Sequence, residues 1–546
     1  MGEAMNLLGR ATLRVGSEAR FAATLLKARG PGVALIPPHR MLSVARALDA
    51  YGPAGAAIVF AASTQPDAVA ICDERGTITF AEVDERSNAL ANALLDRGYQ
   101  PGQSLGILAR NHRGIFEAIF AAAKIGARTL LLNTDFAGPQ LADVCAREEV
   151  VILVHDDEFT SVVAGYHPPL GRVLAWTDAE PTDGTATIDG LVDTSRSAPP
   201  PRPGCKQRIV LLTSGTTGTP KGAPRDLALS MAIPGGYLSK IPLRSGRSVL
   251  LAAPAFHAWG LLSSMLALGL GNTLVTSRRF DPKFTIAALE HHRCDALITV
   301  PVLLARLLAV GEPEIAAHDL SALRVIAVSG SALAPELATR TMDLLGDIVY
   351  NLYGSTEVAY ATIATPHDMR AAPGTVGRPP FGTTVRLLDD DGREVPAGVH
   401  GRIFVGNSIQ FEGYTGGGNK EIVAGLMSTG DVGHFDDAGR LFVDGRGDDM
   451  IVSGGENVFP REIEELLATH DAIVEAAVVG VPDPEFGTRL KAYVVRLPGS
   501  ALDSAAVQEF VKQNLARYKV PREVVFVDDL PRNPAGKIVK RLLPDG

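Results

Sequence analysis

The chain has 546 residues, of which 46% are hydrophobic and 21% are charged, and its formal net charge is -9. This length exceeds the ~100–200 residues of a typical domain, so we expect at least two folded units, and the apolar content excludes a largely disordered chain. The acidic balance and the lack of a dense run of lysine and arginine argue against a nucleic acid partner.

The N-terminal stretch, residues 1–67, is expected to be a helical extension, because Ala19–Lys27 and Met41–Ala50 combine helix-forming composition with interspersed basic residues. Packing on the body is favoured, since the apolar stripe is irregular and the charge density is modest. A weak peripheral contact with a membrane is the alternative. Charged residues interrupt the N-terminus, so no secretory leader is expected and a cytoplasmic location follows.

From residue 68, short β-rich runs such as AVAICD, SLGILAR and ALITV alternate with longer helical runs. This alternation predicts a large α/β body over residues 68–445 with parallel strands. A Pro-rich connection at 195–204 leads into the apolar strand RIVLL. Ala253–Ser277 is long enough to span a bilayer, but its Gly, Ser, Asn and Thr residues favour a buried core helix.

The C-terminal third changes character. The runs TVRLLDD, REVPAG and GRIFVG after residue 380 predict a β-rich subdomain of the body. Residues 446–546 again mix helix and strand, which predicts a small α+β domain. The four cysteines are widely spaced, without a CxxC pair or a histidine cluster at metal-ligand spacing, so free thiols in a reducing compartment are expected. They are Cys72, Cys145, Cys205 and Cys294.

The most informative local pattern is LLTSGTTGTPKG, from Leu211 to Gly222, directly after an apolar strand. Glycines let the backbone approach an anion, the hydroxyl and N–H groups can surround phosphate oxygens, and Lys221 adds a positive charge. The spacing from Gly215 to Lys221 does not fit the Walker pattern. On composition alone, a Gly/Thr-rich turn is the alternative to a phosphate site.

Further motifs follow this loop in a fixed order. They are PAFH at Pro254–His257, VSGSA at Val328–Ala332, YGSTE at Tyr353–Glu357, STGD at Ser428–Asp431, GRGDD at Gly445–Asp449, SGGEN at Ser453–Asn457 and PRNPAGK at Pro531–Lys537. In these motifs the sequence resembles the adenylate-forming superfamily of acyl-CoA synthetases, adenylation domains and luciferases, most of all a bacterial fatty-acid–CoA ligase. The resemblance runs from about residue 68 to the C-terminus.

The resemblance implies that ATP, Mg²⁺ and coenzyme A are used and assigns residues to each. The loop residues that would hold pyrophosphate are Thr213, Ser214, Gly215, Thr216, Thr217, Gly218 and Lys221. The adenine slot would consist of Gly330, Ser331, Ala332, Asn351, Tyr353 and Gly354. Asp431 would bind the ribose with help from Arg446, Thr356 would touch phosphate, and Glu357 would hold Mg²⁺.

The same resemblance implies two catalytic states. Lys537, which alone would be taken for a solvated tail charge, would bridge the substrate carboxylate and the α-phosphate. The C-terminal domain would then turn about a hinge near Asp448, bringing Ser453, Gly454 and Gly455 to line the pantetheine tunnel. The acyl pocket would include His257, Trp259, Gly260 and Val358. We expect His257 to position the substrate rather than to act as an acid or base.

These residues predict an ATP-dependent acid–CoA ligase that releases pyrophosphate and then AMP. No acidic side chain adjoins His257 to pair with an α-amine, and the pocket stretches are small or apolar, so a medium- to long-chain fatty acid is the first expectation. The Gly416–Asn419 run departs from the family pattern and is expected to lie away from the chemistry. Left open are a carrier-protein acceptor, a luciferase-like oxidation, a catalytically idle nucleotide-binding homologue and a homodimer.

Overall fold

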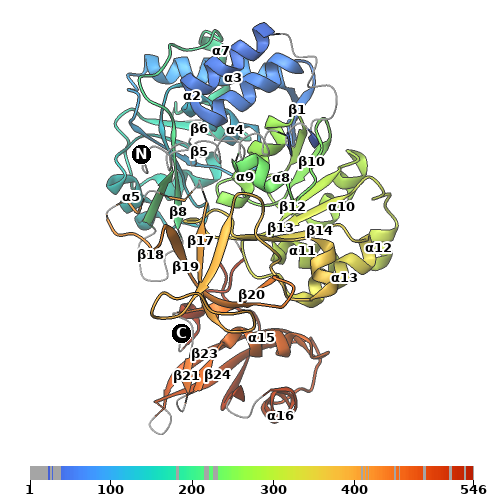
Figure 1. Ribbon diagram of the computed structural model, residues 1–546. Coiled ribbons are helices and arrows are strands. Elements are labelled where there is room, and N and C mark those ends of the chain that lie inside the picture. The colour runs from blue at the N-terminus through green and yellow to red at the C-terminus, as the bar shows by residue number, and fades with distance from the viewer. Residues whose placement is uncertain are drawn as a thin grey trace, which may run out of the picture.

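The computed structural model describes residues 23–24, 27–28, 38–179, 184–213, 221–225, 232–407, 410–411, 413–415, 417–447, 451–453, 456–483, 487–515, 519–533 and 536–544. Figure 1 shows a large body above a smaller C-terminal unit, with a β-rich part between them. This is the predicted α/β class with a small α+β domain.

The body contains an eight-stranded sheet in the order β15-β14-β13-β12-β10-β11-β1-β2. Its inner pairs are parallel and its edge strands β2 and β15 are antiparallel to their neighbours. The strands are β1 (Val69–Asp73), β2 (Gly76–Thr79), β10 (Ser248–Leu251), β11 (Thr273–Thr276), β12 (Ala296–Thr299), β13 (Val325–Val328), β14 (Val349–Tyr353) and β15 (Thr362–Ala364).

A second sheet of the body has the order β7-β6-β5-β3-β4-β8-β9, parallel except for the final pair β8–β9. Its strands are β3 (Ser104–Leu108), β4 (Arg128–Leu131), β5 (Val150–Asp156), β6 (Arg172–Trp176), β7 (Ala186–Thr187), β8 (Arg208–Thr213) and β9 (Lys221–Arg225). The predicted strand after the Pro-rich connection is therefore confirmed.

Helices cover and join the two sheets. They are α2 (Pro38–Thr64), α3 (Phe80–Asp96), α4 (Arg113–Lys124), α5 (Gly138–Arg147), α6 (Thr160–Val163), α7 (Ile188–Thr194), α8 (Ala232–Leu238), α9 (Ala258–Gly269), α10 (Pro282–His291), α11 (Pro301–Leu308), α12 (Glu312–Ala316), α13 (Pro335–Leu345) and α14 (Pro366–Ala371). Phe116 of α4 and Ala267 of α9 belong to one buried cluster with strand residues from both sheets.

The N-terminal prediction is tested only in part. Met41–Ala50 is helical within α2, which bends at Gly52 (φ 74°), while most of Ala19–Lys27 lies outside the described residues. From Ala47 onward, α2 buries alanines, and its contacts are with α3, α4 and α9. Helix α3 begins at a capping box of Thr79 and Glu82, a feature that contributes about 1 kcal/mol to helix stability.

The predicted core helix within Ala253–Ser277 is confirmed as α9, whose Ser263 and Ser264 are fully buried. Over the part of the chain that is described, none of the helices combines the length and apolarity needed to span a bilayer.

The β-rich subdomain is a five-stranded antiparallel sheet. Its strands are β16 (Thr384–Leu388), β17 (Gly401–Gly406), β18 (Ile422–Val423), β19 (Leu426–Phe435) and β20 (Leu441–Arg446). REVPAG, one of the runs on which that prediction rests, is not itself one of these strands: Glu394 makes an isolated bridge to Leu388 where the turn after β16 returns.

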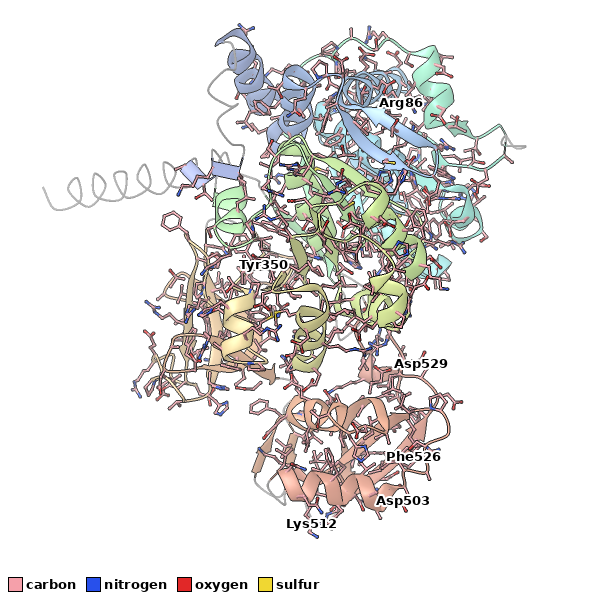
Figure 2. The ribbon with its side chains drawn as sticks, turned by 90° about the vertical axis from the view of Figure 1, so that its right-hand side faces the viewer. Arg86, Tyr350, Asp503, Lys512, Phe526 and Asp529 are labelled. Atoms are coloured by element: carbon pink, nitrogen blue, oxygen red, sulfur yellow. The ribbon has the colours of Figure 1, made fainter. Side chains whose placement is uncertain are left out.

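The C-terminal unit is a small α+β layer. Its elements are β21 (Ile451–Ser453), β22 (Glu456–Val458), α15 (Pro460–Ala468), β23 (Ile473–Asp483), β24 (Gly487–Arg496), α16 (Ser504–Asn514) and β25 (Glu523–Val527). Figure 2 shows Asp503, Lys512 and Phe526 within this unit and Asp529 on its side toward the body.

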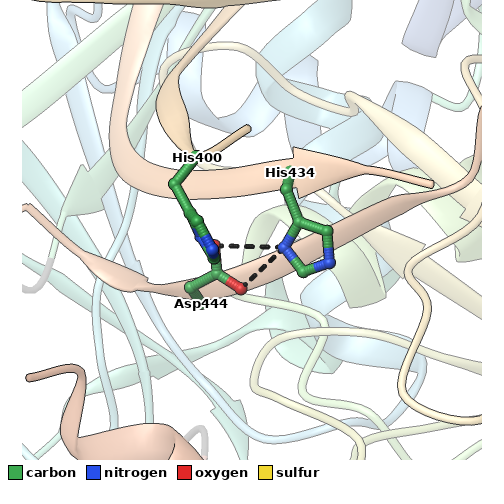
Figure 3. A group of neighbouring side chains, drawn as sticks. All are labelled: His400, His434 and Asp444. Atoms are coloured by element: carbon green, nitrogen blue, oxygen red, sulfur yellow. Dashed lines mark hydrogen bonds and ion pairs between the residues drawn. The ribbon is translucent and has the colours of Figure 1, made fainter. Parts of the chain in front are cut away.

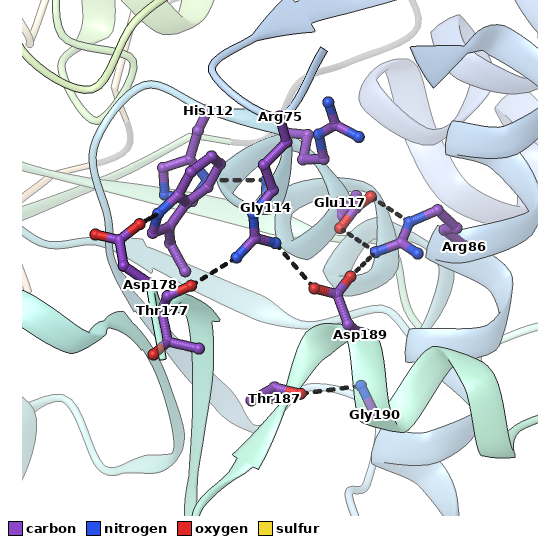
Figure 4. A network of polar contacts seen from close by, with 12 residues as sticks. Arg75, Arg86, His112, Gly114, Glu117, Thr177, Asp178, Thr187, Asp189 and Gly190 are labelled. Atoms are coloured by element: carbon purple, nitrogen blue, oxygen red, sulfur yellow. Dashed lines mark hydrogen bonds and ion pairs between the residues drawn. The ribbon is translucent and has the colours of Figure 1, made fainter. Parts of the chain in front are cut away.

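A partly buried ion-pair network joins elements at the far end of the body (Figure 4). Arg86 of α3 binds Glu117 of α4 at 2.6 Å and Asp189 of α7 at 2.5 Å, and Arg75 reaches the same Asp189 at 2.9 Å. Because Glu117 is almost fully buried, losing Arg86 would leave an unpaired buried charge. The network fixes three helices and lies outside the motifs.

Candidate active site

The motif residues gather where strands of the body end. Val328 ends β13 and Tyr353 ends β14, and the two strands are parallel neighbours in which Val328 pairs with Asn351. Carboxyl ends of parallel strands meet at one edge of a sheet, which is where α/β proteins bind ligands. Thr213 ends β8 in the second sheet and pairs with Lys221 of β9.

Two adjacent residues link the phosphate-loop hairpin to Glu357. Thr415 Oγ1 accepts a hydrogen bond from Gly222 N at 3.0 Å, and Tyr414 Oη donates to Glu357 Oε1 at 2.6 Å. Ala223 and Val358 also share one buried cluster. The start of β9 and the YGSTE motif therefore lie side by side.

The residues assigned to the adenine slot form a rim with unusual backbone geometry. Gly330 has φ +98°, and Ser329 Oγ donates to Leu352 O at 2.7 Å, which ties the loop after β13 to β14. A Cβ on Gly354 would lie 2.1 Å from the carbonyl oxygen of Ala359, so only glycine fits there. Asn351 is buried, whereas Gly330 and Ala332 are exposed.

Asp431 is held by Tyr353, whose Oη donates to Asp431 Oδ2 at 2.5 Å and to Thr429 Oγ1 at 3.3 Å. Burial raises the pKa of the Asp431 carboxyl, although the Tyr353 hydrogen bond and the charges of Arg446, Lys537 and Lys420 act in the opposite direction. Burial and the neighbouring Asp431 charge raise the pKa of Tyr353 well above its ordinary value, so the phenol stays a donor.

Cationic side chains surround this carboxylate. In the register of β19 and β20, Asp431 lies opposite Arg446. A Cβ on the adjacent Gly430 would lie 3.2 Å from Lys420 Nζ and 3.3 Å from Arg446 Nη2, so both cationic groups lie beside this turn. Lys537 is close enough for its charge to lower the pKa of Asp431. The arrangement concentrates positive charge where a polyphosphate would have to be neutralised.

The loop that carries Lys537 rests on the body at α11. Gly536 has φ +76°, and a Cβ on it would lie 2.2 Å from Val302 Cγ1. Arg532 donates to Gly536 O at 2.8 Å and pairs with Glu475, and Lys537 N donates to Asn533 Oδ1 at 2.9 Å. These contacts fix the backbone of the loop and leave the Lys537 side chain exposed.

A cavity of about 360 Å³ opens beside this loop. Arginines dominate its polar lining, and it reaches from the PAFH motif to the lysine loop. Among its lining residues are Arg110, Arg278, Arg279, Arg306, Arg532, Pro254 and Phe256.

Glu357 fits a magnesium ligand in its chemistry. The residue is 8% exposed, its carboxylate is oriented by Tyr414 Oη, and its backbone oxygen accepts from Phe411 N at 2.9 Å. Mg²⁺ prefers oxygen ligands and takes one or two carboxylates together with substrate phosphates. Glu357 would hold the ion, which when bound neutralises phosphate charge.

His257 precedes α9, and its buried Nε2 has no hydrogen-bond partner among the described residues. Burial lowers the pKa of His257 to about 4, so the imidazole is neutral at physiological pH. Trp259 Nε1 donates to Thr299 O at 2.9 Å and its ring stacks on Tyr237, so two contacts hold this predicted pocket residue in place. A Cβ on Gly260 would lie 2.1 Å from Pro254 O, and Val358 is fully buried.

Some predicted residues cannot be placed. Ser214, Gly215, Thr216, Thr217, Gly218, Asp448, Gly454 and Gly455 lie outside the described residues, and only the backbones of Thr213, Lys221 and Ser453 are described. The Gly416–Asn419 run is flanked by Tyr414 and Lys420, which reach Glu357 and the Gly430 turn. None of the motifs quoted above contains Tyr414, so its contact with Glu357 was not expected.

Comparison with known proteins places this geometry in context. The chain matches the AMP-binding enzyme family over residues 59–415 and the AMP-binding enzyme C-terminal domain over residues 462–537. It is 33% identical over 490 residues to an indoleacetate–CoA ligase of Aromatoleum aromaticum, covering 88% of this chain and 95% of that protein. It is 30% identical over 509 residues to the fatty acid–[acyl-carrier-protein] ligase ScoC of Streptomyces coeruleorubidus, covering 89% and 95%.

A solved structure gives the same result. The crystal structure of ATP-bound MatB from Rhodopseudomonas palustris superposes with a TM-score of 0.78 at 28% identity. The superposition covers 89% of this chain and 97% of that one.

Proposed function

The chain belongs to the AMP-binding enzyme family and is an ATP-dependent acid–CoA ligase, and we propose that it activates a hydrophobic carboxylic acid without an α-amine. The acid is first converted to an acyl-adenylate with release of pyrophosphate. Coenzyme A then takes the acyl group and AMP is released.

One observation carries this proposal: the C-terminal loop that holds Lys537 rests on the body, since a Cβ on Gly536 would lie 2.2 Å from Val302 Cγ1 of α11. The first half-reaction brings a carboxylate to the α-phosphorus of ATP, so two anions must meet, and positioned cations lower that barrier. In our proposal, Lys537 lies between the carboxylate and the α-phosphate, Arg446 supports the ribose site at Asp431, and Glu357 holds Mg²⁺.

The acid is proposed from the surroundings of His257. The neutral imidazole presents a buried Nε2 that none of the described residues binds, which suits a hydrogen bond to the substrate carboxyl group. Ala258 and Leu261, which follow His257 in α9, are apolar, and Trp259 of the same helix adds an aromatic surface. A medium- to long-chain fatty acid is the first candidate.

An arylalkanoic acid is the second candidate, because the relative from Aromatoleum aromaticum is an indoleacetate–CoA ligase. Aromatic stacking on Tyr237 and Trp259, whose rings lie 6.0 Å apart, would favour such an acid over a flexible chain.

Coenzyme A is proposed as the acceptor in preference to a carrier protein. The cavity of about 360 Å³ presents arginine side chains, which suit the phosphates of coenzyme A. The similarity to the carrier-protein ligase ScoC makes the carrier the competing acceptor. In the second half-reaction, we propose that residues after Asp448 turn so that Ser453, Gly454 and Gly455 replace the Lys537 loop at the site.

The test is AMP release by the purified chain with ATP and Mg²⁺ across fatty, arylalkanoic and amino acids, with and without coenzyme A. AMP release that requires both an apolar acid and coenzyme A is the expected result, and the preferred acid separates the two candidates. An adenylate that coenzyme A cannot discharge would contradict the acceptor, and preference for an amino acid would contradict the proposed pocket.

A further inference from the structure

Three neighbouring strands of the β-rich sheet bring two histidines and an aspartate together on one face (Figure 3). His400 directly precedes β17, His434 lies on β19 and Asp444 lies on β20. The pairs Gly401–Gly433 and His434–Phe442 set the register that aligns them. The residues are far apart in sequence, so only the sheet creates the cluster.

The ligand atoms of this cluster converge. His400 Nδ1 lies 2.6 Å from Asp444 Oδ2, His434 Nδ1 lies 3.1 Å from Asp444 Oδ1, and one atom from each residue lies within 4.8 Å of the others. Ligands of a tetrahedral ion at about 2.0–2.2 Å stand roughly 3.3–3.6 Å from one another. The ligand atoms of this cluster are 2.6 Å apart in the His400–Asp444 pair and at most 4.8 Å apart overall, so side-chain shifts of up to about 1 Å would admit an ion.

The rings are already oriented for this role. His434 stacks on Phe442 at 5.1 Å with an interplanar angle of 6°, and His400 stacks on Phe459 at 6.3 Å and 17°. The side chain of His400 is 56% exposed and that of Asp444 is 15% exposed, so an ion can enter from solvent. Supported rings and an open side are features of a site that keeps a water ligand.

We propose that His400, His434 and Asp444 bind a divalent cation of the zinc class, with water as the remaining ligand. Two imidazole nitrogens and one carboxylate suit zinc or cobalt, whereas Mg²⁺ prefers oxygen ligands, so this site is distinct from the magnesium position at Glu357. Binding requires neutral imidazoles that present Nδ1 lone pairs, so each ring proton moves to Nε2.

The ion would lie at the junction of the body and the C-terminal unit. Phe459 directly precedes α15 of the C-terminal unit, and its ring stacks on His400. The same ring lies 3.4 Å from the position that a Cβ on Gly445 of β20 would occupy. Fixing His400 therefore also fixes the surface on which Phe459 rests. An occupied site should raise the melting temperature of the whole chain, because the ion binds the folded arrangement of three strands and not the unfolded chain.

The test uses the full chain, stripped with a chelator and titrated with Co²⁺ and then with Zn²⁺ as a competitor. We expect one equivalent of Co²⁺ with a visible band of nitrogen and oxygen ligation and without a thiolate charge-transfer band, and a rise in Tm with Zn²⁺. His434→Gln and His400→Gln should each abolish both signals. His291→Gln is the matched control, because His291 also contacts a second histidine ring, edge-on at 4.7 Å, but belongs to no metal-ligand cluster among the described residues.

Each outcome of these measurements either supports the metal site or overturns it. Adenylation in Mg²⁺ should be unchanged in His400→Gln, which shows that the variant is folded, since His400 is exposed and takes no part in the proposed chemistry. A thiolate band would assign the ion to cysteine and overturn the proposal. So would Co²⁺ binding that survives both glutamine variants, or no binding by the wild-type chain.

Discussion

Tyr353 and Asp431 join two sheets: the Tyr353 hydroxyl at the end of β14 donates to Asp431 Oδ2 on β19 at 2.5 Å. The phenol satisfies one oxygen of a carboxylate that burial would otherwise leave costly to ionise. The eight-stranded sheet thereby orients the group proposed to bind the ribose, although that group belongs to the β-rich subdomain.

Removing this hydrogen bond should weaken ATP binding more than it slows the reaction. A hydrogen bond to a charged group contributes about 1.5–3 kcal/mol, so we expect Tyr353→Phe to raise the KM for ATP roughly tenfold or more while kcat at saturating ATP changes little. Tyr350→Phe on the same strand is the control: Tyr350 is three positions before Tyr353 in β14, and because side chains alternate along a strand, it lies on the opposite face. Equal KM values for the two variants would contradict the role of Tyr353.

Lys537 is expected to act in the first half-reaction. Removing a main electrostatic stabiliser costs at least about 10²-fold in rate, so Lys537→Ala should lower acid-dependent pyrophosphate exchange by that factor while ATP binding persists. Lys512→Ala is the control, because Lys512 pairs with Glu509 at 2.8 Å on α16, within the lower unit of Figure 2. Exchange at the wild-type rate in Lys537→Ala would exclude this role.

Much of the fold could be predicted from the periodicity of apolar residues and from the Gly and Pro residues between elements. The alternation around SLGILAR and ALITV predicted β3 and β12, and the composition of Ala253–Ser277 predicted α9. Within the predicted β-rich subdomain, the sequence could not show that REVPAG lies in the turn after β16, where Glu394 bridges Leu388, whereas TVRLLDD and GRIFVG contain strands. Local pattern cannot distinguish these cases.

The site was predictable only where a motif carries it. Asp431 and Lys537 were named from motifs, but the cations around Gly430 and the bond from Tyr414 to Glu357 depend on strands that come together in three dimensions. The His400, His434 and Asp444 cluster was missed for the same reason, since metal-ligand spacing was sought along the chain and the sheet register supplies it instead.

The buried imidazole of His257 should make stability depend on pH. Burial lowers its pKa to about 4 from the ordinary 6.5, so folding favours the neutral form. The contribution is fully present above pH 6.5 and is lost as the pH falls toward 4, because the unfolded chain takes up the proton first. We expect the wild-type chain to lose more stability than His257→Phe between pH 7 and about 4.5, measured by denaturant unfolding.

The same variant tests whether His257 works as an acid or base. Because the imidazole is neutral throughout the range from about pH 6 to 8, the pH profile of kcat/KM in that range should have the same shape in the wild type and in His257→Phe. A limb near pH 6.5 that disappears in the variant would show that His257 transfers a proton.

The contact between Gly536 and Val302 tests whether the lysine loop docks on α11 during adenylation. A Cβ on Gly536 would lie 2.2 Å from Val302 Cγ1, and the φ of +76° adds strain of about 1 kcal/mol for alanine. Gly536→Ala should therefore displace Lys537 and lower pyrophosphate exchange roughly tenfold or more, while Tm hardly changes because the loop lies at the surface of its unit.

Shortening the opposing side chain should restore part of the activity. Val302→Ala alone should leave exchange near the wild-type rate, and in the double variant Gly536→Ala with Val302→Ala the clash is relieved while the φ strain persists. We expect a favourable coupling energy in the double-mutant cycle on exchange, since the two residues are in direct contact. Additive effects would mean that the loop and α11 are not in contact when the adenylate forms, and that Lys537 reaches the site by another arrangement.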